Sequence, residues 1–174
     1  MIKTKKVFVK GLLLLAKILH SKSYMKLYNK YLEICGVDIK GTVKYIHSSV
    51  YIDTAYANHI HIGDNSVISV NSILLAHDFS VECGLNSIGL GDLQNEKSIV
   101  KDVYIGKNVF IGCGCVILPG TQIGDNCVIG AGTVCSGKIP ENSIVVGEKW
   151  KVIANTTDWA KEKLDEYGAL WGTR

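Results

Sequence analysis

This chain of 174 residues contains only two prolines and three phenylalanines, and it has no Cys-x-x-Cys pair. The shortage of proline beside 18 glycines argues against a disordered, proline-rich chain and for many tight turns. An excess of charge is lacking too, because the formal net charge is only +3. No stripe of mixed aromatic and basic residues appears, so nucleic acid is not an expected partner. With 47% hydrophobic residues, the sequence predicts one soluble globular domain with a substantial core.

The N-terminus lacks a hydrophobic run long enough to cross a membrane. Its uninterrupted apolar stretch, Leu12–Ala16, is bracketed by Lys10 and Lys17, whereas a spanning helix needs about 20 apolar residues. No clear small-x-small cleavage site follows, so a secretory signal peptide is the least favoured reading. An amphipathic helix fits better, packed either on the domain or on an anionic membrane surface. We therefore expect a cytoplasmic protein, with peripheral contact at the inner membrane face as the alternative for this helix.

The six cysteines do not have the spacing of a metal site or of a disulfide framework. Cys113 and Cys115 flank one residue and occupy unlike positions of the repeat described next, so a zinc pair is not expected. Cys115, Cys127 and Cys135 fall at positions that should point inward. We expect reduced, buried thiols in a cytoplasmic protein and no bound metal.

Aliphatic residues recur every six positions along much of the chain. The two series are Ile62, Ile68 and Leu74, and then Ile105, Ile111, Ile117, Ile123, Ile129 and Cys135. Glycine often follows the aliphatic residue, asparagine or glycine usually stands fourth in the hexad, and a small residue stands fifth. Residues two apart in a strand share a face, so the small residue and the next aliphatic residue both point inward. The glycine after the aliphatic residue is expected to start the turn.

Three six-residue faces give a coil of 18 residues, and the repeat predicts an all-β, parallel β-helix. One coil cannot bury its own inner face, so several coils must stack. Between Ile52 and Ile62 the phase of the repeat slips, which predicts a bulged corner. The expected organisation is an N-terminal helical segment at 1–35, a β-helix at 36–154 with a non-repeating loop at 79–102, and a C-terminal helix at 155–174 that is capped by Thr157 or Asp158.

His77 stands fourth in the hexad that begins at Leu74, where most other hexads have asparagine or glycine. Those two residue types tolerate the left-handed conformation of a tight corner better than histidine does. The corner therefore permits a histidine without requiring one. Directly after it the chain leaves the coil for a loop of about two dozen residues, and such long loops in compact domains are usually functional. The alternative is a solvent-facing corner histidine with no function.

Two stretches carry a resemblance to a known family: "IHIGDNSVISVNSILLAHD" and "VYIGKNVFIGCGCVILPGTQIGDNCVIGAGTVCSGKIPENSIVVGEKWKVI". With the loop between them they cover about residues 60–153, and the chain resembles the hexapeptide-repeat acyltransferases, such as the maltose, galactoside and polysaccharide O-acetyltransferases. The resemblance implies a left-handed coil, acetyl-CoA as the cosubstrate and a homotrimer whose subunits share the cofactor groove.

The family's catalytic base is a histidine where the coil opens into the long loop, and His77 matches it. An imidazole titrates near neutral pH and can take a proton from an acceptor hydroxyl, which then attacks the thioester directly. Asp78 is a weaker candidate for orienting His77, because adjacent side chains on a strand diverge.

The resemblance also implies which residues bind acetyl-CoA. The backbone amide of Cys113 falls opposite the thioester carbonyl, and Ala131 falls at a pantetheine contact. Ser136 and Gly137 stand where the family commonly has Thr-Lys, with Lys138 directly after them. The family's terminal arginine is Ala154 here. The full set of implied cofactor contacts is Cys113, Ala131, Ser136, Gly137, Lys138, and, for the 3′-phosphate, Lys149 and Lys151.

The resemblance implies an acetyl-CoA-dependent O-acetyltransferase acting on a sugar hydroxyl, and we expect a role in surface polysaccharide biosynthesis. The acceptor is a small-molecule or lipid-linked sugar, and the length of the acyl group stays open. A γ-type carbonic anhydrase is one alternative, but it needs three histidines around zinc, and none follows His77; His47, His59 and His61 precede it. A non-catalytic assembly subunit is the other, and it would need neither His77 nor the loop.

Overall fold

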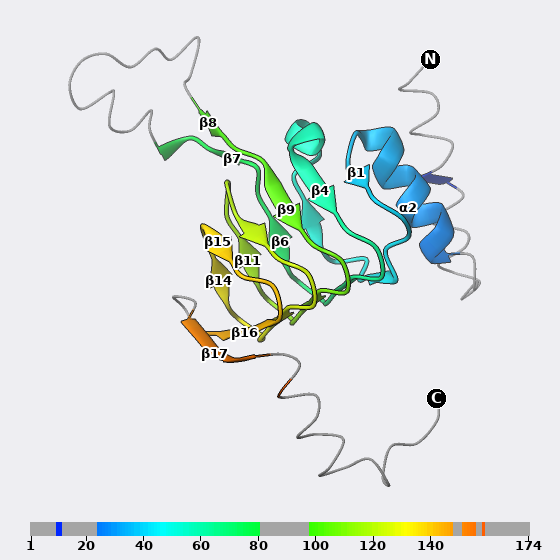
Figure 1. The fold of residues 1–174 in the computed structure, drawn as a ribbon. Helices are drawn as coiled ribbons and strands as arrows, with labels where there is room; N and C mark the ends of the chain where they lie inside the picture. Colours follow the sequence, from blue (N-terminus) through cyan, green and yellow to red (C-terminus); the bar gives the residue numbers. More distant parts are fainter. Residues whose placement is uncertain (1–9, 12–23, 81–97, 148–150, 156–157, 159–174) are drawn as a thin grey trace, which may run out of the picture.

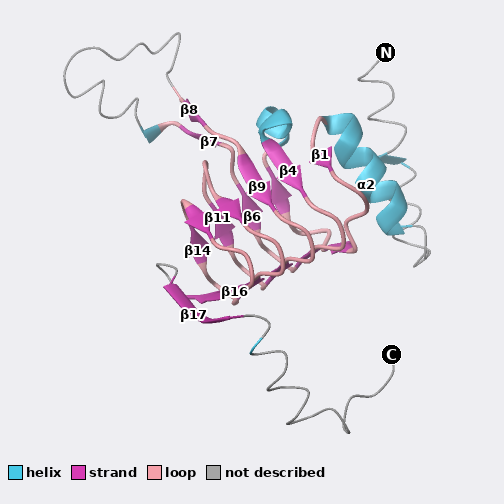
Figure 2. Cartoon of the chain, in the orientation of Figure 1, coloured by secondary structure: helices cyan, strands magenta, loops and turns pink. Residues whose placement is uncertain are grey.

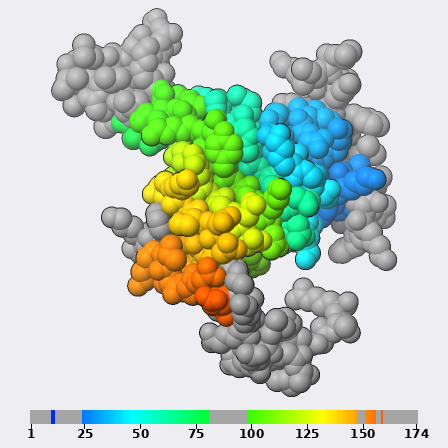
Figure 3. All heavy atoms as spheres, viewed as in Figure 1, coloured from blue at the N-terminus to red at the C-terminus, as the bar shows by residue number. Residues whose placement is uncertain are grey.

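The chain winds through stacked three-sided coils whose strands are only two to five residues long (Figure 1). The computed structural model describes residues 10–11, 24–80, 98–147, 151–155 and 158. Coils follow one another along one axis, from helix α2 at one end to β17 at the other (Figure 2). In the space-filling view the colours run in order from blue to orange, because each coil lies beside the next one in the sequence (Figure 3).

Three parallel sheets form the sides of the coil, and we name them sheets A, B and C. Sheet A contains β1 (Asp38–Ile39), β4 (Ile60–Ile62), β9 (Val103–Ile105), β12 (Gln122–Ile123) and β15 (Lys138–Ile139). Sheet B contains β2 (Tyr45–Ile46), β5 (Val67–Ile68), β10 (Phe110–Ile111), β13 (Val128–Ile129) and β16 (Ser143–Val146), with β17 (Lys151–Asn155) antiparallel at its edge. Sheet C contains β3 (Tyr51–Ile52), β6 (Ile73–Leu74), β11 (Val116–Ile117) and β14 (Val134–Cys135).

The pairing register confirms the predicted coil length. Ile111 of β10 pairs with Ile129 of β13, and Ile117 of β11 pairs with Cys135 of β14, so equivalent residues are 18 apart. Each strand is too short to persist alone, and its backbone hydrogen bonds go to the coils on either side. The stack is therefore one cooperative unit.

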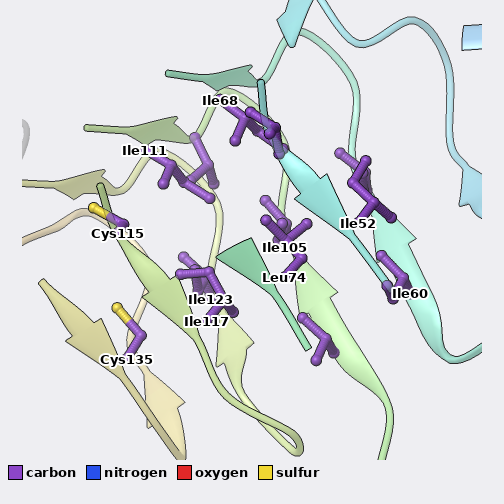
Figure 4. Close-up of a cluster of buried hydrophobic side chains, with 14 of the residues drawn as sticks. Ile52, Ile60, Ile68, Leu74, Ile105, Ile111, Cys115, Ile117, Ile123 and Cys135 are labelled. Carbon is purple, nitrogen blue, oxygen red and sulfur yellow. The ribbon is translucent and has the colours of Figure 1, made fainter. Parts of the chain in front are cut away.

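Side chains from all three sheets meet along the axis of the coil (Figure 4). The predicted inward positions are all buried, none more than 3% exposed: Ile62, Ile68, Leu74, Ile105, Ile111, Ile117, Ile123, Ile129 and Cys135. The small residues two positions before them are buried as well: Ser66, Ser72, Val109, Cys115, Thr121, Cys127 and Thr133. Burying each isoleucine stabilises the stack by about 1.5–3 kcal/mol, so this column is the main source of stability.

The corners depend on the fourth position of the hexad. Asn65, Asn108, Asn126 and Asn142 all have φ between +53° and +57°, the left-handed region that asparagine tolerates. Their side chains form a ladder along one corner: each amide nitrogen donates to the next amide oxygen, over 3.2, 3.1 and 3.2 Å. The asparagines thus set the turn and also link four coils.

The glycine after the aliphatic residue has a different role from the one we expected. Gly124 is not among the residues with positive φ, so it does not make the turn. A Cβ added there would lie 2.4 Å from the backbone nitrogen of Glu141 in the next coil. Glycine is needed at this position because the backbones of successive coils approach too closely for a side chain.

Two segments interrupt the repeat. The predicted bulged corner is the 3-10 helix η1 (Thr54–His59), which is inserted between sheets C and A. The loop begins at β7 (His77–Asp78), which pairs antiparallel with β8 (Ile99–Val100). Residues 81–97 of the loop lie outside the described part of the chain. His77 is extended and has no positive φ, so our placement of it at a left-handed corner was wrong: strand pairing with Val100 keeps the chain straight.

Helix α2 (Tyr24–Cys35) covers the open end of the first coil and lies within the predicted N-terminal helical segment. Leu32 is 1% exposed, and the buried Asn29 amide donates to the carbonyl oxygens of Met25 and Val43, at 2.9 and 3.0 Å. The predicted basic amphipathic helix, apart from residues 10–11, lies outside the described residues. No helix in the described ranges is both long and apolar enough to cross a bilayer.

The C-terminal end differs from the predicted boundary. Asn155 is the last residue of β17 rather than the first of a helix, and its Oδ1 accepts a hydrogen bond from the backbone amide of Asp158 at 3.4 Å. Thr157 and the rest of the predicted C-terminal helix lie outside the described residues.

Replacing Gly124 by alanine should destabilise the protein by roughly 1–3 kcal/mol or more, because the methyl group would press on the rigid backbone of the next coil. Thermal unfolding followed by circular dichroism measures the loss. The matched control is Gly132→Asn, since Gly132 has φ of +72° and a Cβ there would meet no atom within 4 Å. Asparagine should be tolerated at that corner, and equal losses for the two variants would contradict the close-approach explanation.

Candidate functional site

His77 lies at the point where the coil opens into the loop. The preceding residue, Ala76, is fully buried, and it is joined to the returning chain by the hydrogen bond from the Lys101 amide to its carbonyl oxygen (3.0 Å). The His77 side chain is 21% exposed, so its ring is largely enclosed but still reachable from solvent. The pairing of His77 with Val100 therefore holds the backbone at the imidazole in a defined place.

A buried carboxylate orients the imidazole. Asp53 directly follows β3, and the pairing of Ile52 with Leu74 brings it beside the end of β6. Its Oδ2 accepts hydrogen bonds from His77 Nδ1 and from the Ala76 backbone amide (3.2 Å). Because an ionised carboxylate can only accept, Nδ1 carries the proton and Nε2 presents a lone pair. This is the arrangement that a general base requires.

The carboxylate is almost completely shielded from water. Only 1% of the Asp53 side chain is exposed, and its Oδ1 has no hydrogen-bond partner among the described residues. Burying a carboxylate is unfavourable unless it is paired, so the hydrogen bonds to Oδ2 must offset the loss of hydration.

Two aromatic rings bracket the imidazole. Tyr56 stacks on His77 with ring centroids 4.5 Å apart, and Phe79 meets it edge-on at 5.1 Å. Tyr56 comes from the kink inside η1, where its backbone leaves helical geometry. The inserted helix thus places an aromatic ring against the candidate base, which a regular corner would not do. Phe79 is 42% exposed, so the site has an apolar rim.

Asp78 does not orient His77 in this structure. Its side chain points to solvent and its Oδ1 accepts a hydrogen bond from the Ser80 backbone amide at 2.7 Å, which is the main reason why the pKa of Asp78 is lowered. The partner, Asp53, escaped the sequence analysis because it lies in the irregular first coil. A signal was present: in the regular hexads the position after the aliphatic residue holds glycine, serine or leucine, never a carboxylate.

The implied cofactor contacts occupy two corners. Cys113 and Ala131 are exposed at the corner between sheets B and C, where the Gly132 amide donates to the Cys113 carbonyl oxygen at 2.8 Å. The exposed stretch from Ser136 to Lys138 forms the next corner, between sheets C and A. Lys151 is exposed in β17, and Lys149 lies outside the described residues.

His77 and Cys113 lie on opposite edges of sheet C in one chain. Cys113 precedes β11, whereas His77 in β7 follows β6. Crossing the sheet takes about five residues of extended chain, or roughly 15 Å. A single chain therefore does not bring the candidate base and the Cys113 amide to one reacting atom.

Comparison with known proteins identifies the fold and the family. The family described as bacterial transferase hexapeptide (six repeats) matches residues 102–137. YvoF of Bacillus subtilis is 32% identical over 114 residues, which are 66% of this chain and 55% of that protein. Galactoside O-acetyltransferase of Escherichia coli is 31% identical over 132 residues, with 68% of this chain and 64% of that protein covered.

A solved structure agrees with these matches. A galactoside acetyltransferase in complex with coenzyme A superimposes with a TM-score of 0.61 and 27% identity, over 92% of this chain and 84% of that one. The chain belongs to the hexapeptide-repeat acyltransferase family. Its coil is therefore the predicted left-handed parallel β-helix. The chain spans 55% and 64% of the lengths of the two relatives compared.

The other three histidines within the described residues do not converge on a metal site. His59 Nδ1 contacts Asp102 at 2.6 Å, His61 Nδ1 contacts Asp38 at 2.9 Å, and His47 contacts the Ser49 hydroxyl at 2.8 Å. No cluster of three or more metal-ligating side chains occurs within the described residues. The geometry of this family member therefore gives the carbonic-anhydrase alternative no support.

The thiols should differ sharply in reactivity. Burial raises the pKa of Cys135 to about 12, and it raises the pKa of Cys115 and of Cys127 as well. The thiolate is the reactive form, and Cys113 is exposed. N-ethylmaleimide at about pH 8 should therefore modify Cys113 and spare those three in the native protein.

Peptide mass spectrometry measures the modification of each thiol. Protein unfolded in guanidinium chloride is the control, because all four thiols should then react. Modification of Cys127 or Cys135 as fast as Cys113 in the native state would contradict the inward orientation of these side chains.

Proposed function

We propose that this protein is an acetyl-CoA-dependent O-acetyltransferase that acts on a sugar hydroxyl, with His77 as the general base. The observation that carries the proposal is the buried Asp53 carboxylate, which fixes the His77 ring through Nδ1 and leaves Nε2 without a hydrogen-bond partner among the described residues. The galactoside O-acetyltransferase among its relatives, and the coenzyme A bound to the similar structure, support the same chemistry.

Each step can be assigned to residues of this chain. Acetyl-CoA supplies an acetyl group activated as a thioester. His77 Nε2 accepts the proton of the acceptor hydroxyl while that oxygen bonds to the thioester carbonyl carbon. Asp53 stabilises the imidazolium that results. The Cys113 backbone amide donates to the carbonyl oxygen as negative charge develops there. His77 then returns the proton to the departing sulfur, so the acetyl ester and free coenzyme A form with no net change in the protein.

The corners fit a long, thin ligand that approaches the backbone. A Cβ added at Gly114, Gly132 or Gly137 would meet no atom within 4 Å, so the backbone there is open on its outer side. Ala131, which adds only a methyl group, lies with Gly114 and Gly132 at the corner between sheets B and C, whereas Gly137 lies at the other edge of sheet C. Lys151 is exposed in β17. We propose that Lys151, together with Lys149, provides positive charge for the phosphates of coenzyme A.

We further propose that the site forms between copies of the chain. Since His77 and Cys113 lie on opposite edges of sheet C, both can face one thioester when the Cys113 edge of a second copy meets the His77 edge of the first. A cyclic homotrimer gives every copy the same pair of neighbours and closes the ring. The base and the oxyanion donor of each site then come from different chains.

The acceptor we propose is a glycan hydroxyl in surface polysaccharide biosynthesis, either on a free sugar or on a lipid-linked one. The relative named for galactosides supports a sugar acceptor. Next to His77, the exposed ring of Phe79 offers an apolar surface for one face of a sugar.

Substituting His77 by alanine should lower turnover by about 10²–10⁴-fold, the usual contribution of a general base. Asp53→Asn keeps the shape of the carboxylate but cannot neutralise the imidazolium, so it should lower turnover by roughly tenfold or more. Release of coenzyme A thiol, measured with acetyl-CoA and a panel of galactosides and glucosides, reports both effects.

Asp78→Asn is the matched control, because Asp78 is the adjacent carboxylate and bonds to the Ser80 amide rather than to His77. This variant should keep nearly full activity, and the KM for acetyl-CoA should change little in all three. Near-normal turnover of His77→Ala would remove His77 from the mechanism.

Binding of the cofactor should protect Cys113 from alkylation. Desulfo-coenzyme A, which has no thiol to consume the reagent, should slow the modification of Cys113 by N-ethylmaleimide by about tenfold at saturation, because the ligand covers that corner. Peptide mass spectrometry measures the rate of modification of Cys113. Cys35, at the C-terminal end of α2, is the internal control.

The same sample tests the assembly. Light scattering of the sample in which desulfo-coenzyme A slows the alkylation of Cys113 should give the mass of three chains. Unchanged labelling of Cys113 would contradict the cofactor position, and a fully active monomer would contradict the shared site.

A further inference from the structure

The outer surface of sheet A differs in character from those of the other two sheets. Pairing places five side chains in one outward row across sheet A: Asp38, His61, Tyr104, Gln122 and Lys138. The corresponding rows are apolar on sheet B (Tyr45, Val67, Phe110, Val128) and on sheet C (Tyr51, Ile73, Val116, Val134). Sheet A is therefore the face that is chemically suited to a polar ligand.

One aromatic ring in the row is fixed in position although it is 42% exposed. Tyr104 stacks on His61 with ring centroids 4.3 Å apart and planes 8° from parallel. Its hydroxyl donates to Asp102 Oδ2 at 3.2 Å, a bond that raises the pKa of Tyr104 and keeps the phenol neutral. His61 is held in turn by Asp38 at 2.9 Å. These contacts fix the Tyr104 side chain in the free protein, so ligand binding costs little additional side-chain entropy.

The free face of this ring opens onto a groove. His61 covers the side of Tyr104 toward β4, and the opposite side faces Gln122 of β12. From Tyr104 a groove of about 570 Å³ runs over β12 and β15, and its walls carry an amide, an ammonium group and two carboxylates. The side chains that provide them are Gln122, Lys138, Asp125 and Glu141. The view in Figure 3 looks onto this part of the coil stack, where the yellow and orange coils follow the green ones.

We propose that this groove is a glycan-binding platform centred on Tyr104, separate from the acetyl-transfer site at His77. A sugar ring has one face of C–H groups, which packs on an aromatic face, and an edge of hydroxyls, which donate to carboxylates and accept from amide and ammonium groups. The groove matches that pattern, because the fixed ring of Tyr104 lies beside an amide, an ammonium group and two carboxylates. A purely anionic ligand would instead require positive charge without the two carboxylates.

The platform begins close to the candidate base along the chain. Val100 pairs with His77, the Lys101 amide bonds to Ala76, and Asp102, the partner of the Tyr104 hydroxyl, follows directly. One oligosaccharide can therefore contact both regions, with one residue at His77 and a more distant one on Tyr104. Binding at Tyr104 does not itself require acetyl transfer.

The experiment is saturation-transfer NMR on the full chain with maltohexaose, cellohexaose and a β-1,4-galactohexaose at roughly millimolar concentration. The wild-type protein and Tyr104→Phe, which keeps the ring, should both transfer saturation to at least one of them. Tyr104→Leu should weaken that binding by about tenfold, the scale of one aromatic contact. Tyr45→Leu is the matched control, because Tyr45 is also 42% exposed but lies on sheet B.

The His77→Ala variant separates this inference from the proposed function. Binding that depends on Tyr104 and persists in His77→Ala supports the platform, even if the protein transfers no acetyl group. The inference is overturned if none of the three hexasaccharides binds, or if Tyr104→Leu binds as well as the wild type. It is overturned as well if Tyr104→Leu changes the number of chains measured by light scattering, because sheet A would then be a contact between copies.

Discussion

The structure depends on backbone hydrogen bonds between coils that are too small to be stable alone. Most strands are two residues long, and the strand after each corner must meet the same strand one coil earlier. This explains why glycine stands at the positions where the backbones of successive coils approach most closely. A methyl group at Gly124 would separate two coils, whereas an exchange of asparagine for glycine at a corner leaves the spacing intact.

The regular hexads repeat the same backbone surfaces, so the cluster of side chains around the candidate base has to come from the places where the repeat is interrupted. Two interruptions occur at the same corner region, one coil apart: η1 follows β3, and the loop follows β6. The first supplies Asp53 and Tyr56, and the second supplies His77 and Phe79. The candidate site is thus the product of two insertions whose ends are brought together by the pairing of β3 with β6.

This origin explains which features the sequence could predict. The inward column, the 18-residue coil and the left-handed corners follow from a six-residue period, and His77 stands out as a departure from that period. Asp53 could not be assigned in the same way, because its distance from His77 depends on where the irregular coil regains its register. The straight course of the chain at His77 was missed for a related reason: it depends on pairing with Val100, which lies beyond a loop without any repeat.

The three faces of the coil also divide the molecule's functions. Removing the apolar outward rows of sheets B and C from water costs less desolvation free energy than removing the polar row of sheet A. This difference agrees with the proposed contact between copies at the edges of sheet C, where His77 and Cys113 lie on opposite sides. Sheet A is then left facing solvent, and its fixed tyrosine is available to a ligand that a neighbouring copy would otherwise exclude. In the proposed assembly, the same outward rows would thus leave sheet A free for the glycan that we propose binds there.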